Sequence, residues 1–264
     1  MHLSSLHLYP IKSSAPLEVD SAIVEARGLR FDRRWMVVDA EGRFLTGRQL
    51  PRMTLIRALP HAGGLALEAP GKPALQVPVP DAGDTLPVTV WKSQVAARPA
   101  GDAADAWLSD FLGKPVRLVH MDDHITRPMT DVYSQPGDEV SFADAFPLLL
   151  ISRASLEGLN SRLATPVSML QFRPNLVVDG VPAHAEDTWK RIRIGEVEFD
   201  VAKACTRCVF TTVDPLRGER DPDGEPLRTL ITYRRTADGV TFGQNLIPRS
   251  LGQVRVRDAL EVLA

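Results

Sequence analysis

Two cysteines placed three residues apart offer the most specific chemistry in this chain. Cys205 and Cys208 are its only cysteines, and they enclose Thr206 and Arg207. An ionised cysteine sulfur is a nucleophile and a soft metal ligand, and a nearby cation favours the ionised form. Lys203 and Arg207 supply positive charge in this segment. The segment is therefore a candidate metal or redox site.

Three other interpretations of the cysteine pair have to be weighed. A structural zinc site needs four ligands, and the chain has no second pair of cysteines to complete one. A thioredoxin-like dithiol begins a helix, whereas residues 209–213 are rich in β-branched side chains and predict a strand. Two buried cysteines without a chemical role are the third interpretation. The sequence therefore disfavours a zinc site and a thioredoxin-like dithiol. It leaves open that the two cysteines are buried and have no chemical role.

The elements that must hold these cysteines are mostly strands. Short alternating runs bounded by turn residues predict strands at residues 6–9, 17–19, 35–38, 65–68, 75–77, 88–91, 117–120, 175–178, 192–194 and 197–201. Capping residues and apolar spacing predict helices that begin near Asp102, Ser152 and Pro226. We therefore expect a mainly β protein of the α+β class, in which the helices lie at the periphery of a β-barrel.

Composition limits the partners of the protein. Its 264 residues can bury a large core, and 31 basic against 33 acidic side chains leave a net charge of −2. A protein with so small and negative a net charge would not attract a nucleic-acid polymer or an anionic membrane by its overall electrostatic field. No segment approaches the roughly 20 apolar residues of a membrane span, and the N-terminus lacks a targeting pattern. We expect a cytoplasmic protein with reduced thiols.

Several separated motifs share one resemblance. They occupy residues 9–13, 28–37, 46–49, 51–53, 160–163, 172–178, 186–189, 205–215 and 242–245. In this order they resemble the MOSC proteins that carry an N-terminal β-barrel region, the group of the mitochondrial amidoxime-reducing component and its bacterial relatives. The resemblance implies a MOSC-type β-barrel at residues 96–264, preceded by an N-terminal β-barrel region at residues 1–95.

The resemblance also implies a cofactor and the residues that hold it. In the family the second cysteine of the motif ligates the molybdenum of a pterin cofactor, which makes Cys208 the metal ligand and a catalytic residue, whereas Cys205 is not a ligand. The family positions that bind the molybdenum–molybdopterin cofactor correspond to Lys12, Ser13, Arg33, Arg173, Asn175, Thr206 and Arg207. The cations in this set suit the terminal phosphate of the pterin.

Two further residue types have competing interpretations. Asp214 precedes Pro215, so its carboxylate could close a turn, or it could stand near the metal as a proton relay and act as a second catalytic residue. The four tryptophans, Trp35, Trp91, Trp107 and Trp189, are most simply anchors of the core or of a barrel wall.

An activity follows from the same resemblance. It implies a molybdenum-dependent oxidoreductase that reduces N-hydroxylated small molecules such as hydroxylaminopurines and amidoximes. A ferredoxin-type [2Fe–2S] cluster needs four cysteines, so we expect no iron–sulfur cluster in this chain and a separate flavin or iron–sulfur reductase as electron donor. The alternative is a non-catalytic carrier of the molybdenum cofactor or of sulfane sulfur.

Overall fold

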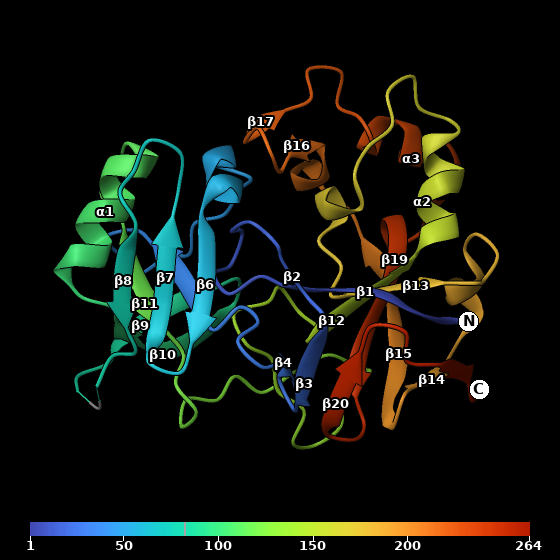
Figure 1. Ribbon diagram of the computed structural model, residues 1–264, viewed down its shortest axis with the longest axis horizontal. Coiled ribbons are helices and arrows are strands. Elements are labelled where there is room, and N and C mark those ends of the chain that lie inside the picture. The colour runs from blue at the N-terminus through green and yellow to red at the C-terminus, as the bar shows by residue number, and fades with distance from the viewer. Residues whose placement is uncertain (82) are drawn as a thin grey trace.

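Two lobes lie side by side in the computed structural model, which describes residues 1–81 and 83–264 (Figure 1). The described residues form three α-helices and many short strands, so the predicted mainly β fold with peripheral helices is confirmed. The helices are α1 (Asp102–Leu112), α2 (Arg153–Asn160) and α3 (Leu227–Tyr233). Short 3-10 helices are η1 (Pro51–Leu55), η2 (Met169–Phe172), η3 (Ala185–Thr188) and η4 (Val209–Thr212).

The larger lobe is built on a nine-stranded sheet. Its strands are β1 (His2–Leu8), β2 (Leu17–Val19), β12 (Leu148–Ser152), β13 (Leu176–Asp179), β14 (Arg191–Ile194), β15 (Val197–Thr206), β18 (Arg235–Thr236), β19 (Gly239–Pro248) and β21 (Leu260–Val262). They follow the order β2-β1-β13-β12-β19-β15-β14-β21, and β18 pairs with β19. Backbone bonds from Leu3 to Asp258 and from Leu260 to Met1 bring β1 beside β21, so the sheet curves towards a barrel and the two termini meet.

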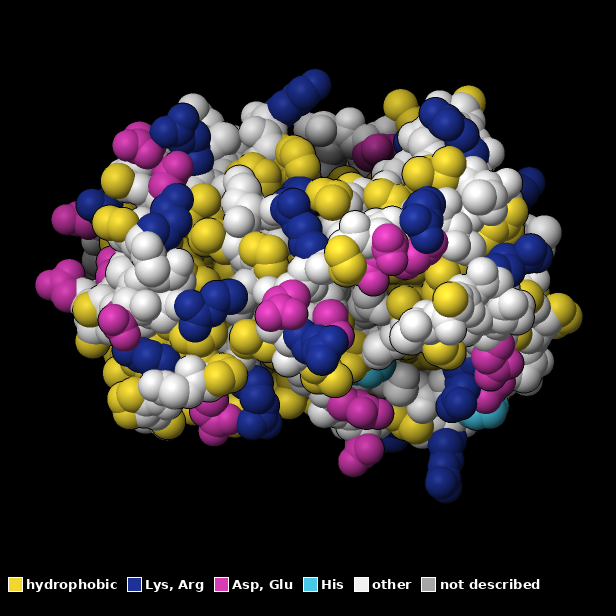
Figure 2. All heavy atoms as spheres, turned by 90° about the horizontal axis from the view of Figure 1, so that it is seen from above, with side chains coloured by type: hydrophobic (Ala, Val, Ile, Leu, Met, Phe, Trp, Pro, Cys, Tyr) yellow, Lys and Arg dark blue, Asp and Glu magenta, His cyan; other side chains and the backbone are white. Residues whose placement is uncertain are grey.

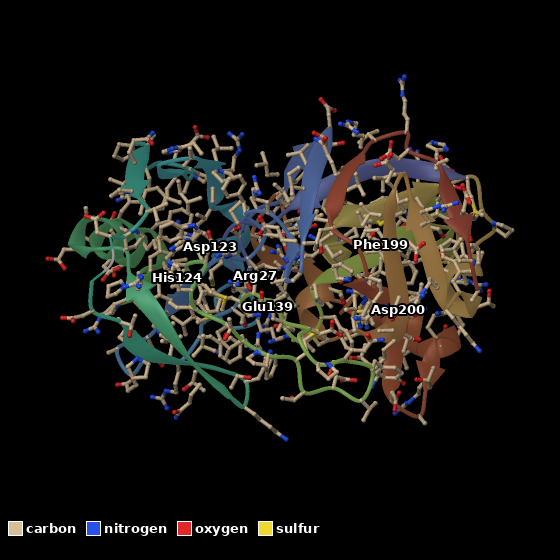
Figure 3. The ribbon with its side chains drawn as sticks, turned by 90° about the horizontal axis from the view of Figure 1, so that it is seen from below. Arg27, Asp123, His124, Glu139, Phe199 and Asp200 are labelled. Carbon is tan, nitrogen blue, oxygen red and sulfur yellow. The ribbon has the colours of Figure 1, made fainter. Side chains whose placement is uncertain are left out.

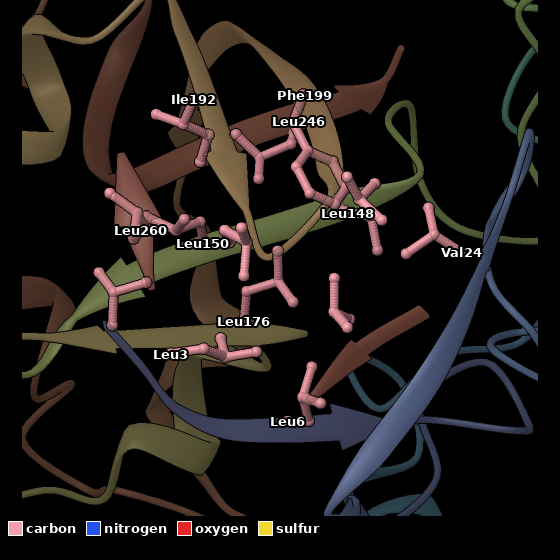
Figure 4. Packing of buried hydrophobic residues seen from close by; sticks show 14 of the residues in the cluster. Leu3, Leu6, Val24, Leu148, Leu150, Leu176, Ile192, Phe199, Leu246 and Leu260 are labelled. Carbon is pink, nitrogen blue, oxygen red and sulfur yellow. The ribbon is translucent and has the colours of Figure 1, made fainter. Parts of the chain in front are cut away.

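The interior of this barrel holds apolar side chains from both ends of the chain (Figure 4). Leu3 and Leu6 of β1 meet Leu150 of β12 and Phe199 of β15, and all four are fully buried. Alternate residues of a strand face the same side, which places each strand's apolar set inward. Burial of each such side chain stabilises the fold by about 1.5–3 kcal/mol. The N-terminal strands are therefore part of the larger lobe's core.

A small three-stranded sheet packs against the barrel. It has the order β20-β3-β4 and contains β3 (Ser21–Glu25), β4 (Gly28–Leu29) and β20 (Gly252–Arg255). Val24 and Leu29 of this sheet join the barrel's apolar cluster. Segments more than 200 residues apart in sequence are thus packed into one unit.

The smaller lobe contains two more sheets. Its strands are β5 (Trp35–Val38), β6 (Arg57–His61), β7 (Gly64–Glu68), β8 (Leu75–Pro78), β9 (Leu86–Val90), β10 (Ser93–Pro99) and β11 (Arg117–His120). The sheets have the orders β5-β11-β10-β9 and β6-β7-β8, and α1 packs Trp107 and Phe111 against them. Residues 1–95 are β-rich as predicted, with η1 as an addition. The division between residues 95 and 96 stays a prediction, and that point falls inside β10.

The three predicted helices are present and begin at or next to the expected residues, although the N-cap of α1 is Gly101 and not Asp102. Helix α1 ends at Leu112 and is capped by Gly113, whose φ of 70° is the left-handed conformation that glycine adopts without strain. The Ser152 hydroxyl accepts the Ser155 amide and caps α2, and α3 begins directly after Pro226. No helix in the described ranges is long and apolar enough to cross a membrane. Basic and acidic side chains are interspersed on the face that Figure 2 shows.

Arginines fix the segment that connects the lobes. Arg27 lies beside Glu139 at 3.0 Å near the middle of the molecule (Figure 3). The buried guanidinium of Arg127 donates to the carbonyl oxygens of Ser141, Ala143 and Asp144 at 3.0, 2.6 and 3.1 Å. Because a hydrogen bond to a charged donor is stronger than a neutral one, these contacts hold the backbone at Asp144 in place.

The prediction of a strand at residues 209–213 is wrong. Residues 209–212 form η4, and only Val213 and Asp214 form a strand, β16 (Val213–Asp214), which pairs with β17 (Glu219–Arg220). The hydroxyls of Thr211 and Thr212 donate to the carbonyls of Cys208 and Val209 at 2.9 and 2.8 Å. These local bonds stabilise a turn and override the β preference of threonine.

Candidate functional site

One open cavity of about 160 Å³ gathers every predicted site residue except Asp214. The smaller-lobe side of its wall includes Arg48, and the connecting segment supplies Asp144. The predicted residues that line it are Lys12, Ser13, Arg33, Arg173, Asn175, Thr206, Arg207 and Cys208. Residues from six of the separate sequence motifs thus face one space, and the assigned roles of the predicted residues in binding stay predictions.

Strands β15 and β19 deliver the cysteines to this cavity. The pairing of the two strands shifts between Ala204 and Thr206, which is an irregularity of the kind that often re-aims side chains next to active sites. Arg207 then donates its amide to Val240 at 2.7 Å, and the chain turns into η4 at Cys208. Burial raises the pKa of the Cys205 thiol, although Arg207 opposes this, so Cys205 favours the neutral form.

The cation at Cys208 is Arg48, which the sequence analysis did not single out. Its Nε lies 3.3 Å from the Cys208 Sγ. The two cations expected to serve this purpose are used elsewhere. Lys203 lies 3.7 Å from Asp238 and outside the cavity, and Arg207 donates to the carbonyls of Phe172 and Phe242. Arg48 belongs to the motif at residues 46–49, but its sequence position gives no link to a cysteine 160 residues away.

Asp144 is the second residue that sequence reasoning missed. Its carboxylate accepts from Lys12 Nζ at 2.5 Å, Arg48 at 3.0 Å and the Trp91 indole at 3.1 Å. Burial alone would raise its pKa, but Lys12 and Arg48 hold the pKa well below its usual value. Burial also lowers the pKa of Lys12 to about 8, against the opposing effect of Asp144. Both groups are charged at neutral pH.

The deep end of the cavity holds two guanidinium groups around one buried ring. Arg33 and Arg173 lie 4.6 and 4.0 Å from the centre of the Tyr9 ring. Arg33 also donates to Asp32 at 2.5 Å and to the Asn175 side chain at 3.0 Å. Removal from bulk water lowers the pKa of Arg173 to about 10, so it keeps its charge at neutral pH. Stacking on Tyr9 therefore fixes both cations before any ligand binds, and the ion pair with Asp32 holds Arg33 in addition.

Backbone strain concentrates at the same place. Ser13, Arg33 and Arg173 have φ values of 70°, 50° and 59°, which is the left-handed region that few residues other than glycine adopt. Each such residue costs of order 1–3 kcal/mol and persists only where its surroundings enforce it. Three of them on one cavity wall mark it as a functional site.

The donors in the cavity fit a phosphate-bearing cofactor that brings its own metal ligands. Arg173 Nη2 is buried and has no hydrogen-bond partner among residues 1–81 and 83–264, although Nη1 donates to Ser14 at 2.7 Å. An anionic oxygen would satisfy this nitrogen. The described residues contain no group of three or more His, Cys, Asp and Glu side chains that could hold a metal. The soft Cys208 sulfur suits a metal that arrives already held by the sulfur ligands of its cofactor.

Asp214 lies outside this cavity, so the structure does not bring it together with the other predicted site residues. Its carboxylate accepts the amides of Leu216 and Arg217 at 2.8 and 3.3 Å. These bonds close the turn between β16 and β17, and the side chain lines a different groove. The turn interpretation of the Asp-Pro pair therefore fits the structure.

Comparison with known proteins agrees with the fold. Residues 1–115 match the MOSC N-terminal beta barrel domain, and residues 137–261 match the MOSC domain. Mitochondrial amidoxime-reducing component 1 of Mus musculus is 38% identical over 280 residues, which cover 99% of this chain and 82% of the mouse protein. The Danio rerio protein of the same name is 39% identical over 245 residues, covering 89% of this chain and 75% of the relative. The Homo sapiens protein of the same name is 35% identical over 280 residues, covering 99% of this chain and 82% of the human protein. The chain thus belongs to the MOSC family, in the group that contains the mitochondrial amidoxime-reducing components.

Proposed function

We propose that the protein is a molybdenum-cofactor-dependent reductase of N-hydroxylated compounds such as hydroxylaminopurines and amidoximes, supplied with electrons by a separate flavin or iron–sulfur reductase. The observation that carries this proposal is the cavity that joins the Cys208 sulfur to a cationic wall, where one Arg173 guanidinium nitrogen has no hydrogen-bond partner among the residues that the structure describes. The relatives' name, amidoxime-reducing component, supports the reaction class. A cytoplasmic location stays a prediction, and the names of those relatives describe mitochondrial proteins.

The residues of the chain would perform three tasks: they would ligate the metal, hold the cofactor and orient the substrate. Cys208 would ligate the molybdenum, while Arg33, Arg173 and Asn175 would hold the pterin and its phosphate at the deep end of the cavity. Arg207 binds the carbonyls of Phe172 and Phe242, so it secures the cysteine loop against the sheet in addition to lining the cavity. The bound cofactor supplies the two-electron chemistry of molybdenum.

The remaining task is to orient the substrate. Reduction of an N–OH group to N–H with release of water consumes two electrons and two protons. Asp144 is ionised at neutral pH and keeps acceptor capacity on a half-exposed side chain, so it would receive a hydrogen bond from the substrate's N–H or O–H group. Arg48, which donates to the Cys208 sulfur and to Asp144, links the metal ligand with this acceptor.

Turnover with a chemical reductant tests the proposal. Protein loaded with the molybdenum cofactor should convert benzamidoxime to benzamidine with reduced viologen as electron source, and two electrons should be consumed for each product. Cys208→Ala should abolish the reaction. A molybdenum-replete protein that consumes neither benzamidoxime nor hydroxylaminopurine would instead support the carrier of cofactor or sulfane sulfur.

A further inference from the structure

Trp91 departs from the expected role of a buried anchor in the core or in a barrel wall. The residue is 49% exposed, whereas the other three tryptophans are buried. It occupies the turn between β9 and β10 with a φ of 55°, an unusual conformation for a bulky side chain. An exposed indole on a strained turn needs a physical explanation, because exposure of so large an apolar surface does not help folding.

Three contacts hold this exposed indole in a fixed position. Its Nε1 donates to Asp144 at 3.1 Å, and the Arg48 guanidinium lies 4.7 Å from its ring centre. The Phe44 ring packs against it at 5.1 Å with a tilt of 54°. Two of these partners, Arg48 and Asp144, line the cofactor cavity. The indole is therefore a rigid part of the cavity's surroundings, although half of it faces solvent.

Exposure changes in a consistent direction through the cavity. Side chains at the deep end are shielded, with Asn175 fully buried and Arg33 12% exposed. The Asp144 side chain is 52% exposed, and Val209, which directly follows Cys208, is 41% exposed. Through its contacts with the lining residues Arg48 and Asp144, Trp91 lies next to this exposed side, two contacts away from the Cys208 sulfur. A substrate has to arrive from this side, since the cofactor would fill the deep end.

We infer that Trp91 is a substrate-contacting residue that stacks on flat, conjugated N-hydroxylated molecules and favours them over aliphatic ones. This inference rests on the proposed reductase function. A planar ring can lie on the exposed indole while its N–OH group reaches the acceptor at Asp144. An aliphatic amidoxime has the same reacting group and no flat face. Because an aromatic pair contributes about 0.5–1.5 kcal/mol beyond burial, the preference should be clear but moderate.

The test compares benzamidoxime with acetamidoxime in the cofactor-loaded enzyme. Trp91→Leu should raise KM for benzamidoxime about fivefold and leave KM for acetamidoxime unchanged. Trp91→Phe keeps a flat face without the indole N–H donor, so its KM for benzamidoxime should stay close to that of the wild type. Tyr133→Leu removes another exposed aromatic side chain that lines a separate cavity, and it should match the wild type with both substrates.

Binding measured without a reductant separates the inference from the proposed function. Calorimetric titration of the cofactor-loaded protein with benzamidoxime should show weaker binding to Trp91→Leu than to Trp91→Phe. Equal effects of Trp91→Leu on both amidoximes, in KM or in binding, would show that Trp91 only supports Arg48 and Asp144 and would overturn the inference. Absence of turnover in the wild type would contradict the reductase, while the binding comparison would still decide the role of Trp91.

Discussion

At the scale of single residues, the motifs predicted site residues that the structure gathers in one cavity, and they missed Arg48 and Asp144, whose contacts are with residues far away in the chain. Lys12, Arg33, Arg173 and Cys208 each sit in a recognisable segment, and they converge on one cavity. Arg48 and Asp144 escaped notice because their partners are 160 and 96 positions away in the chain. A hydrogen bond between distant residues leaves no periodic pattern, so only the folded geometry shows it.

Lys12 provides a pH-dependent prediction at this scale. Burial lowers its pKa to about 8, so the cavity loses one positive charge as pH rises through that value. An anionic cofactor should then be held less tightly. We expect the pterin retained after dialysis to fall between pH 7 and pH 9, measured by the fluorescence of the oxidised pterin.

Two variants define the controls for this experiment. Lys12→Met lacks the charge at every pH, so it should retain less pterin at pH 7 and lose the step near pH 8. Lys72→Met removes a lysine that pairs with Asp110 away from the cavity, and it should keep the wild-type profile. A step of unchanged size in Lys12→Met would assign the titration to another group.

At the scale of elements, the alternating strands and the capped helices were predictable, whereas the turn after Cys208 was not. Strand and helix patterns repeat over several residues and report the buried face directly. In residues 209–212 the same β-branched side chains bond back to the preceding carbonyls, and local hydrogen bonding decides the outcome. The site lies at this irregular segment, where propensity carries the least information.

The close contact between Gly47 and the Phe210 ring of η4 leads to a second prediction. A Cβ added at Gly47 would lie 2.2 Å from the Phe210 ring, which lines the cavity and lies 5.4 Å from the Arg173 guanidinium. Gly47→Ala should therefore displace this ring, lower the pterin content and destabilise the protein by about 1–3 kcal/mol. Pterin yield and denaturant unfolding measure the two effects.

A double-mutant cycle identifies the ring as the cause. In a Phe210→Ala background the space for the new methyl group is open, so Gly47→Ala should cost little there. Gly63→Ala is a matched control, because its Cβ would meet only the His61 side chain at an ordinary 3.5 Å. If Gly47→Ala had the same effect with and without Phe210, steric contact with the ring could not explain it.

At the scale of the whole molecule, the architecture joins segments that the sequence order separates. Strand β1 pairs with β13, and β3 pairs with β20, so the first residues of the chain complete the lobe formed by the last ones. Composition and strand count predicted a mainly β fold. They could not show which strands become neighbours, because that depends on long-range pairing in the folded chain. The cavity consequently draws its wall from both halves of the sequence.

Molybdenum and pterin contents of three purified proteins test the central claim most directly. Wild type, Cys205→Ser and Cys208→Ser would be prepared identically, with thermal unfolding to establish that all three are folded. Because the Cys208 sulfur is assigned as the protein ligand of the metal, Cys208→Ser should lose most of its molybdenum, whereas Cys205→Ser should stay close to the wild type. Equal molybdenum contents in folded Cys208→Ser and wild type would contradict this assignment and the site built on it.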